Sequence, residues 1–137
     1  GLAHKHLPEM QTLAGLDNAP VFVPILGDIR QGMMTSVMLQ NRLLNGSPTA
    51  QDICEMLSSY YEGQEMVRVL PFGGETPRLA TSALAGKDYL TITVSGHTDQ
   101  TLLTAQFDNL GKGASGAAVQ NMNIMLGFPE TTGLNMD

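Results

Sequence analysis

Two histidines and a glutamate lie close together near the start of the sequence. The stretch "AHKHLPEM" places His4, His6 and Glu9 within six residues. Histidine is the side chain best suited to proton transfer near neutral pH, and a neighbouring carboxylate can fix its tautomer and raise its basicity. The pattern is typical of a general base with its orienting acid. A metal site and a pair of exposed histidines at a frayed terminus stay open as alternatives.

The rest of the sequence gives the metal site no further ligands. His97 is the one other histidine, it is distant in the sequence, and no other group of residues has metal-ligand spacing. We therefore expect no bound metal.

A second stretch with possible chemistry is "NLGKGASGAAVQNMNIMLG", residues 109–127, in which Gly111, Gly113 and Gly116 form Gly-x-Gly-x-x-Gly before a predicted helix. A dinucleotide-binding fingerprint also needs a second parallel strand, with an acidic residue about 20 positions on. No such strand follows, so the motif by itself favours a helix start whose small residues allow close packing. Lys112 fits this less well, because the positive end of the helix dipole repels it unless an anion binds there.

Composition narrows the class of protein. At 137 residues the chain corresponds to one domain or part of one. Its net charge is −6 and its seven Lys and Arg residues are spread out, so we expect no nucleic-acid partner. No apolar run reaches the roughly 18 residues of a membrane span. The single cysteine, Cys54, excludes an internal disulfide, and with no signal-peptide pattern at the start we expect a cytoplasmic protein.

Hydrophobic periodicity predicts the elements that must position these groups. We expect helices over residues 7–16, 49–62 and 112–127, strands over 19–27, 32–44, 65–70, 79–86, 89–96 and 101–109, and a loop over 71–78. Many strands joined by short turns, with few helices between them, indicate an α+β domain with a mixed, mainly antiparallel sheet and helices on one face.

The helix over residues 49–62 has the best-defined start and stop signals. Thr49 is the expected N-cap with Asp52 three residues on, and Gly63 follows the end. The apolar side is expected to pack on the sheet and consists of Ile53, Met56, Leu57 and Tyr60. Cys54 lies among these residues and is expected to be a buried, inert thiol.

Taken together, "HKHLPEM" and "FDNLGKGASGAAVQNMNIMLGFPETTGL" closely resemble the carboxyl-terminal part of the N-acetyl-gamma-glutamyl-phosphate reductase family. The second motif is shared in looser form with aspartate-semialdehyde dehydrogenases, and the resemblance covers nearly the whole chain. It implies a Rossmann NADP domain followed by an α+β domain like the carboxyl-terminal domain of glyceraldehyde-3-phosphate dehydrogenase. Residues 1–108 would form this catalytic and dimerisation domain. Residues 109–137 would form the last helix, which packs on the NADP domain.

The resemblance also implies a reaction. The family reduces an acyl phosphate, N-acetyl-glutamyl 5-phosphate, to a semialdehyde with NADPH and releases phosphate, in arginine biosynthesis. Such chemistry needs a thiolate nucleophile, a base and a hydride donor. By resemblance the nucleophilic cysteine and the NADP site belong to the upstream part of the enzyme, so we expect no NADP on this chain. A homo-oligomer is expected.

Roles follow residue by residue from the same resemblance. It gives catalytic roles to His4 and His6, an orienting role to Glu9, a substrate-binding role to Arg30, and places near the coenzyme to Asn109, Lys112 and Gly113. The glycine-rich stretch would then begin the last helix and would be no Rossmann fingerprint. Which histidine is the base stays open.

The chain departs from the family pattern at three places. Ile25 stands where the family usually has His, Gln31 where it has Arg, and "GKD" ending at Asp88 where it tends to have Gly-Ser-Asn. Arg30, one place earlier, could supply the missing charge. The alternatives are therefore a related acyl-phosphate reductase, similar to aspartate-semialdehyde dehydrogenase or of an aminoadipate type, and a non-catalytic oligomerisation module.

Overall fold

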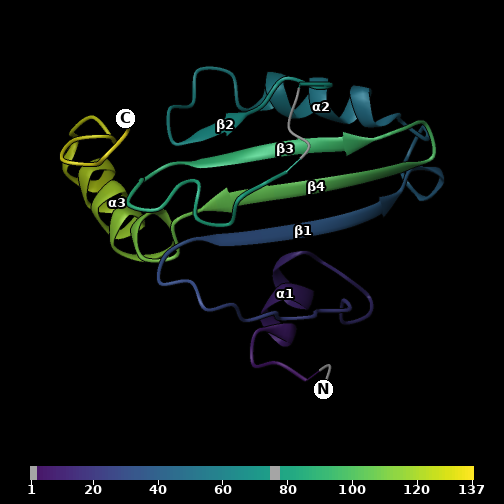
Figure 1. Cartoon of the computed structure of the whole chain (residues 1–137), viewed down its shortest axis with the longest axis horizontal. Helices are drawn as coiled ribbons and strands as arrows, with labels where there is room; N and C mark the ends of the chain where they lie inside the picture. The colour runs from purple at the N-terminus through teal and green to yellow at the C-terminus, as the bar shows by residue number, and fades with distance from the viewer. Residues whose placement is uncertain (1–2, 75–77) are drawn as a thin grey trace.

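The computed structural model describes residues 3–74 and 78–137 and contains a four-stranded sheet with helices beside it (Figure 1). In chain order the elements are α1 (Leu7–Leu13), β1 (Met33–Gln40), a 3-10 turn (Asn41–Leu43), α2 (Ala50–Tyr60), β2 (Val67–Val69), β3 (Leu90–Gly96), β4 (Gln100–Phe107), a π-helical turn (Gly111–Ser115) and α3 (Gly116–Leu126). The expected α+β class is confirmed.

The sheet has the strand order β1-β4-β3-β2. β4 pairs antiparallel with β1 and β3, whereas β2 pairs parallel with β3, so the sheet is mixed and mainly antiparallel, as expected. β3 and β4 form a hairpin, in which the His97 N–H donates to the Gln100 carbonyl at 2.9 Å. The hairpin forms the middle of the sheet, and β1 joins its free side from a distant part of the sequence.

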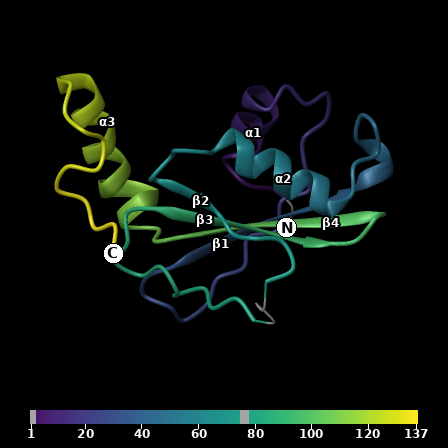
Figure 2. The same cartoon turned by 90° about the horizontal axis from the view of Figure 1, so that it is seen from above.

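Helix α2 covers one face of the sheet (Figure 2). Its start is the predicted capping box, in which Thr49 Oγ1 accepts from the Asp52 N–H at 3.2 Å and the Asp52 carboxylate accepts from the Thr49 N–H at 2.8 Å. The buried core consists of Ala50, Ile53 and Cys54 from this region and Val94 of β3. The expected burial of Cys54 is confirmed, and its thiol lies 3.5 Å from the carbonyl of Leu70.

The predicted apolar side of α2 is only half right. Ile53 and Leu57 face the sheet, but Met56 and Tyr60 are 60% and 77% exposed. Ala50, Ile53, Cys54 and Leu57 have the spacing i, i+3, i+4, i+7, which is the face that the helix turns to the core. The small residues Ala50 and Cys54 let α2 approach the sheet closely. With this face turned to the sheet, the larger side chains of Met56 and Tyr60 lie outside the core.

The opposite face of the sheet carries polar side chains on β3 and β4 and is partly covered by the segment that follows β2 (Figure 2). The Gln106 side chain donates to the Ala80 carbonyl at 2.9 Å. The hydroxyls of Ser36 and Thr104 lie 3.1 Å apart on neighbouring strands, and Thr93 is the register partner of Thr104 on the next strand. Thr104 and Gln106 are buried, so this face has a polar layer under the covering segment.

The predicted strand over residues 19–27 is wrong. This stretch is irregular and belongs to no sheet, and Val21, Ile25 and Leu26 are largely exposed. Pro20 and Pro24 have no N–H to donate to a neighbouring strand, so the apolar composition of the stretch is not sufficient for pairing.

The predicted strand over residues 79–86 is also wrong. The chain forms successive turns there, with N–H groups of Ala83, Ala85 and Lys87 bonded to carbonyls three residues earlier. Only Leu84 of this stretch is buried. Its small residues suit tight turns that cover the polar face, and Thr81 is its one β-branched residue of the kind typical of strands. The expected loop over 71–78 lies partly outside the described residues.

The predicted third helix has a more complex start than expected. In its first turn the Gly113 N–H donates to the Asp108 carbonyl at 2.8 Å, and the Ser115 N–H to the Leu110 carbonyl at 3.0 Å, each five residues apart. This π-helical turn precedes the regular helix that begins at Gly116. Within the described part of the chain, no helix has the length and apolar character needed to cross a membrane.

Candidate functional site

Helix α1 positions the histidine and glutamate cluster. Pro8 lies in the first turn, His6 precedes the helix, and Glu9 follows one turn later on the same side. The His6 Nδ1 atom lies 2.6 Å from Glu9 Oε2, and the His6 N–H donates to His4 Nδ1 at 3.3 Å. The structure therefore brings the three residues together as the sequence predicted.

The orientation of His6 suits proton transfer. Because the Glu9 carboxylate binds Nδ1, it favours the tautomer that carries its proton there, and Nε2 is left to accept a proton from another group. The His6 and Glu9 side chains are 49% and 65% exposed, so the pair contributes no more than about 1 kcal/mol to stability. The pair thus adds little to the stability of the fold, and its role in proton transfer stays a prediction.

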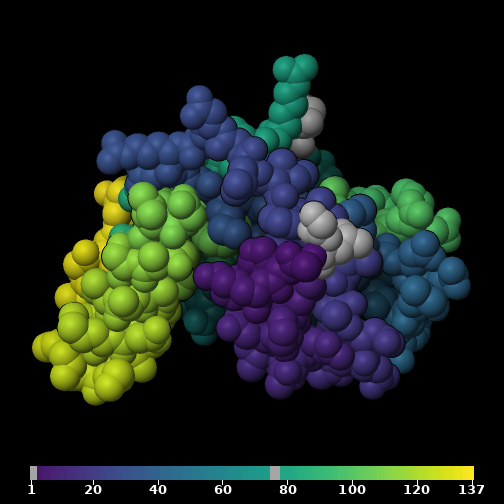
Figure 3. All heavy atoms as spheres, turned by 90° about the horizontal axis from the view of Figure 1, so that it is seen from below, coloured from purple at the N-terminus to yellow at the C-terminus, as the bar shows by residue number. Residues whose placement is uncertain are grey.

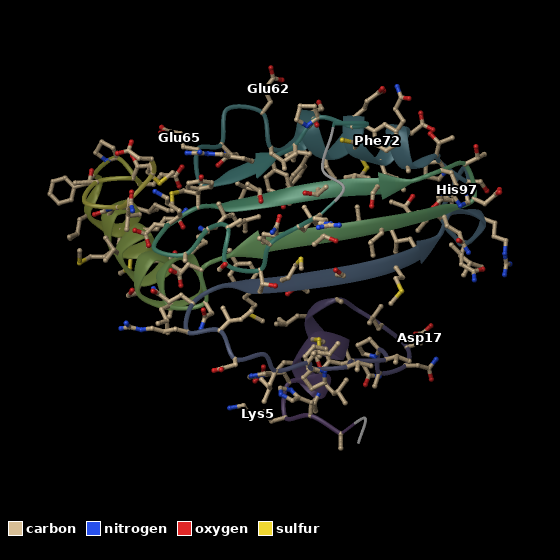
Figure 4. The ribbon with its side chains drawn as sticks, in the orientation of Figure 1. Lys5, Asp17, Glu62, Glu65, Phe72 and His97 are labelled. Atoms are coloured by element: carbon tan, nitrogen blue, oxygen red, sulfur yellow. The ribbon has the colours of Figure 1, made fainter. Side chains whose placement is uncertain are left out.

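His4 is held by packing rather than by a carboxylate. Its ring lies edge-on to the ring of Phe22 with 4.9 Å between centroids, and 5.1 Å from the ring of His6. Lys5, between the two histidines, is exposed beside the N-terminal segment (Figure 4). His97 lies at the β3–β4 turn, well away from α1, and among the described residues no group of three or more His, Cys, Asp or Glu side chains could hold a metal ion (Figure 4).

The predicted substrate residue, Arg30, lies exposed in the segment that leads into β1. The two residues after it are tied to the end of β4. Gln31 Nε2 donates to Asp108 Oδ2 at 3.0 Å, and the Gly32 N–H donates to Asn109 Oδ1 at 2.9 Å. Gln31, which departs from the family pattern, therefore has a defined partner in this chain.

Asp108 is the residue that sequence reasoning missed. It is completely buried, and its carboxylate accepts hydrogen bonds from Gln31 and from the N–H groups of Gly86, Leu110 and Gly111. Burial alone would raise the pKa of this carboxyl, but the four donors outweigh it and hold the pKa below its usual value. The sequence does contain a signal for this role. Aspartate at the end of a strand often accepts a hydrogen bond from the N–H two residues later, which here belongs to Leu110.

The three residues expected near the coenzyme are engaged with the chain itself. Asn109 Oδ1 accepts from Gly32, and Lys112 Nζ donates to Gln120 Oε1 at 2.5 Å. A Cβ at Gly113 would lie 3.1 Å from the Asp108 carbonyl and 3.2 Å from the ring of Phe107, so a larger residue there would have to displace these neighbours by a few tenths of an ångström. Burial lowers the pKa of Lys112, against the opposite effect of Glu130 and Asp88.

Asp88, a second departure from the family pattern, anchors the C-terminal segment. Its carboxylate accepts from the Asn135 N–H at 2.8 Å, and its own N–H donates to the Asn135 carbonyl at 2.9 Å. A Cβ at Gly111 or at Gly116 would run into the Asp88 carboxylate. The glycines of the Gly-x-Gly-x-x-Gly stretch thus serve close packing, which was the structural interpretation of the motif. Ile25, the third departure, is 87% exposed.

The histidine cluster and the start of α3 lie on different parts of the molecule. In the described ranges no hydrogen bond or ion pair joins His4, His6 or Glu9 to Asn109, Lys112 or Gly113. The face shown in Figure 3 is hollowed between the N-terminal segment and α3. The two groups of predicted site residues therefore belong to the segments on either side of this hollow.

A separate apolar cavity lies under α2. It has a volume of about 440 Å³ and lies between α2 and the sheet, with Leu39, Leu44, Ile53 and Leu57 in its walls. Its lining is mostly apolar, and the acid among the lining residues, Asp52, accepts the capping hydrogen bond from the Thr49 N–H.

Comparison with known proteins identifies the family. The model of the "Semialdehyde dehydrogenase, dimerisation domain" family matches residues 1–109. The chain is 42% identical over 138 residues to N-acetyl-gamma-glutamyl-phosphate reductase 2 of Nostoc sp., with 96% of this chain and 43% of that protein covered. It is 47% identical over 130 residues to N-acetyl-gamma-glutamyl-phosphate reductase of Brucella ovis, with 92% and 42% covered.

The chain spans less than half the length of these curated relatives. The family model, in contrast, matches most of the chain, including α1 with its histidines and all four strands of the sheet. By this match, the chain belongs to the semialdehyde dehydrogenase dimerisation-domain family.

Proposed function

We propose that this chain forms the second domain of an N-acetyl-gamma-glutamyl-phosphate reductase. Such an enzyme uses NADPH to reduce N-acetyl-glutamyl 5-phosphate to N-acetylglutamate 5-semialdehyde and releases phosphate. The observation that carries the proposal is the 2.6 Å contact between His6 and Glu9 in a chain whose relatives bear this enzyme's name. Residues 1–108 would form the catalytic and dimerisation domain, and residues 109–137 the helix that packs on the coenzyme domain.

In this proposal the chain supplies the base. His6, with Nδ1 held by Glu9, accepts through Nε2 the proton of the thiol that attacks the acyl phosphate. His4 packs beside it and is the second candidate for this role. Arg30, exposed in the segment before β1, supplies the positive charge for the substrate phosphate.

NADPH, when bound to such an enzyme, supplies the hydride. The residues of this chain do not fit a binding site for the phosphates of NADPH. The side-chain oxygen of Asn109 and the ammonium of Lys112 have partners within the chain, and the space beside Gly113 is occupied by Asp108 and Phe107. We therefore assign the nucleotide site to the rest of the enzyme and give these three residues a supporting place beside it.

The catalytic role is tested in the full-length enzyme by changing the histidines one at a time. His6→Ala or His4→Ala should lower kcat by about 10²- to 10⁴-fold, because acid–base help of this size is lost. Coenzyme binding should stay nearly unchanged, since the histidines act on the thiol and the substrate. Lys5→Ala, between them and exposed, is the matched control (Figure 4). Near-normal kcat in both histidine variants would remove the assigned role.

A specific observation supports the alternative of an assembly module. The matching family is a dimerisation domain, and Met38 of β1 is 84% exposed beside its register partner Leu102. A homo-oligomer is part of both alternatives. The isolated chain should show no NADPH oxidation with the acyl phosphate, whereas the full-length enzyme should. A full-length protein that assembles but reduces neither this acyl phosphate nor a related one would leave only the assembly role.

The exact substrate and the location are the finer parts of the proposal. Ile25, Gln31 and Asp88 differ from the usual family pattern, so acyl phosphates of the aspartyl and aminoadipyl type are the alternative substrates to compare with N-acetyl-glutamyl 5-phosphate. A cytoplasmic location is supported by the single free thiol of Cys54.

A further inference from the structure

The carboxylate of Asp108 joins three separate parts of the chain. Its Oδ1 accepts from the N–H groups of Leu110 at 2.7 Å and Gly111 at 3.2 Å, and its Oδ2 accepts from Gln31 Nε2 at 3.0 Å and from the Gly86 N–H. Each oxygen thus has two donors, which is the full capacity of an ionised carboxylate. A side chain that is completely buried and fully satisfied in this way fixes the geometry of all its partners.

These contacts extend the pairing of β1 and β4 beyond the last residues of the sheet. The last register pair is Met33 with Phe107. The residues before Met33 are then held by the residues after Phe107, through Gln31 to Asp108 and Gly32 to Asn109. Side-chain hydrogen bonds therefore replace main-chain pairing at this end of the sheet, where Figure 1 shows α3 leaving β4.

The main chain held in this way carries Arg30. In the part of the chain that the structure describes, no ion pair involves the Arg30 guanidinium, so the direction of this side chain depends on the backbone beside it. Gln31 is the next residue, and its hydrogen bond to Asp108 is the nearest side-chain contact that limits rotation of that backbone.

We infer that Asp108 is a positioning residue, which acts through Gln31 to fix the main chain that carries Arg30 against the turn at Gly111. The position of Arg30 relative to the substrate phosphate then depends on the Asp108 carboxylate, which contacts neither Arg30 nor the phosphate. This inference rests on the proposed function, because it assigns Arg30 to the phosphate of an acyl-phosphate substrate.

The first test removes one of the four hydrogen bonds to Asp108 and keeps the other three. In the full-length enzyme, Gln31→Leu keeps the size of the side chain but loses the bond to Asp108, so KM for the acyl phosphate should rise about 10-fold, as for loss of one hydrogen bond to a charged group. KM for NADPH should not change. Gln51→Leu, an exposed glutamine of α2 bonded to Glu55, is the matched control and should leave both constants unchanged.

A double-mutant cycle separates positioning from a general loss of structure. Arg30→Ala should raise KM for the acyl phosphate and weaken the binding of inorganic phosphate, the released product, measured by calorimetry. Adding Gln31→Leu to Arg30→Ala should cause no further change, because the residue being positioned is already absent. If the two effects multiply instead, Gln31 does not act through Arg30 and the inference is overturned.

Asp108→Asn provides a second variant. It should raise KM for the acyl phosphate at least as much as Gln31→Leu, because in either orientation the new NH2 group replaces an oxygen that accepts from two donors. If Asp108→Asn fails to fold, the Gln31 and Arg30 cycle still decides the question. Failure of the proposed function has a different signature, which is a full-length wild-type protein without acyl-phosphate reductase activity.

Discussion

Asp108 shows how a buried carboxylate can remain ionised and stabilise a fold. Its pKa is lowered in the folded chain, because four hydrogen bonds outweigh the effect of burial. A carboxyl whose folded pKa lies below its unfolded value of about 3.9 stabilises the protein above that pH. This stability is lost as pH falls through the folded pKa.

We therefore predict that Asp108→Asn lowers the melting temperature at neutral pH and also flattens the loss of stability on the acid side. Thermal unfolding of the full-length protein, measured from about pH 7 down to about pH 3, checks this. Asp17→Asn, at an exposed position, is the control and should keep the acid dependence of the wild type. An unchanged acid dependence in Asp108→Asn would show that Asp108 is not ionised in the folded state.

For two threonines on the face of the sheet opposite α2, we predict opposite effects of a change to valine on stability. Among the described residues Thr93 Oγ1 is buried without a hydrogen-bond partner, whereas Thr104 Oγ1 lies 3.1 Å from Ser36 Oγ. Thr93→Val should therefore raise stability by up to about 1 kcal/mol, and Thr104→Val should lower it by about 1 kcal/mol. Melting temperatures of the two variants give the signs. A destabilised Thr93→Val would mean that its hydroxyl has a partner in the assembled protein.

At the scale of the elements, Gly32 determines how β1 begins. It has a φ of 121°, and a Cβ there would overlap the Thr81 carbonyl and lie 2.9 Å from Ser82 Cα. Gly32→Ala should cost at least about 2 kcal/mol, because the covering segment must move away from the sheet. Gly46→Ala is the matched control, since Gly46 also has a positive φ of 78° but nothing within 4 Å, and it should cost about 1 kcal/mol. Equal losses of stability would contradict close contact at Gly32.

Elements with local signals could be predicted from the sequence. The capping box of Thr49 and Asp52 marks the start of α2, and the alternating apolar residues of β3 and β4 mark two strands, because each signal reflects an interaction within a few residues. The histidine cluster was predictable for the same reason, since a single turn of α1 joins His6 to Glu9.

Features that depend on distant partners could not be predicted in this way. The segment over residues 79–86 lies over the sheet rather than in it, and its place depends on Gln106 and Gly32, far away in the sequence. Asp108 likewise gains its role from Gln31 and Gly86. Sequence periodicity reports which face of an element is apolar but not which loop covers the other face.

At the scale of the whole molecule, β1 offers a surface for assembly. Leu39 and Leu103 pack toward α2, so their neighbours Met38 and Leu102 point to the opposite face, where they lie side by side as register partners. Met38 is 84% exposed, and adjacent exposed apolar side chains of this kind mark interaction sites. We infer that this patch belongs to the interface of the homo-oligomer that we propose.

Met38→Glu should accordingly reduce the mass of the full-length protein in solution to that of a smaller species, because a charge cannot be buried unpaired in the interface. Light scattering coupled to size-exclusion chromatography measures this. Tyr60→Glu introduces the same charge on α2, at a side chain that is 77% exposed, and should leave the mass unchanged. A native mass for Met38→Glu would place the interface elsewhere.

The apolar side of α3 is the second large exposed surface. Met122 and Met125 are 51% and 85% exposed, so α3 does not bury these two side chains against the sheet domain of the same chain. A contact with the coenzyme domain or with another chain stays a prediction for these residues.

The strand order has a consequence for synthesis on the ribosome. In the sheet formed by the described residues β1 has β4 as its one neighbour, and β4 is the last strand of that sheet to be made. At 5 to 20 residues per second, β1 emerges roughly 3 to 15 s before its partner, whereas β4 can pair with β3 as soon as the hairpin turn is complete. During these seconds a methionine-rich strand has no neighbour on either edge. Chaperones that recognise extended apolar segments can bind β1 in this interval, before it pairs with β4.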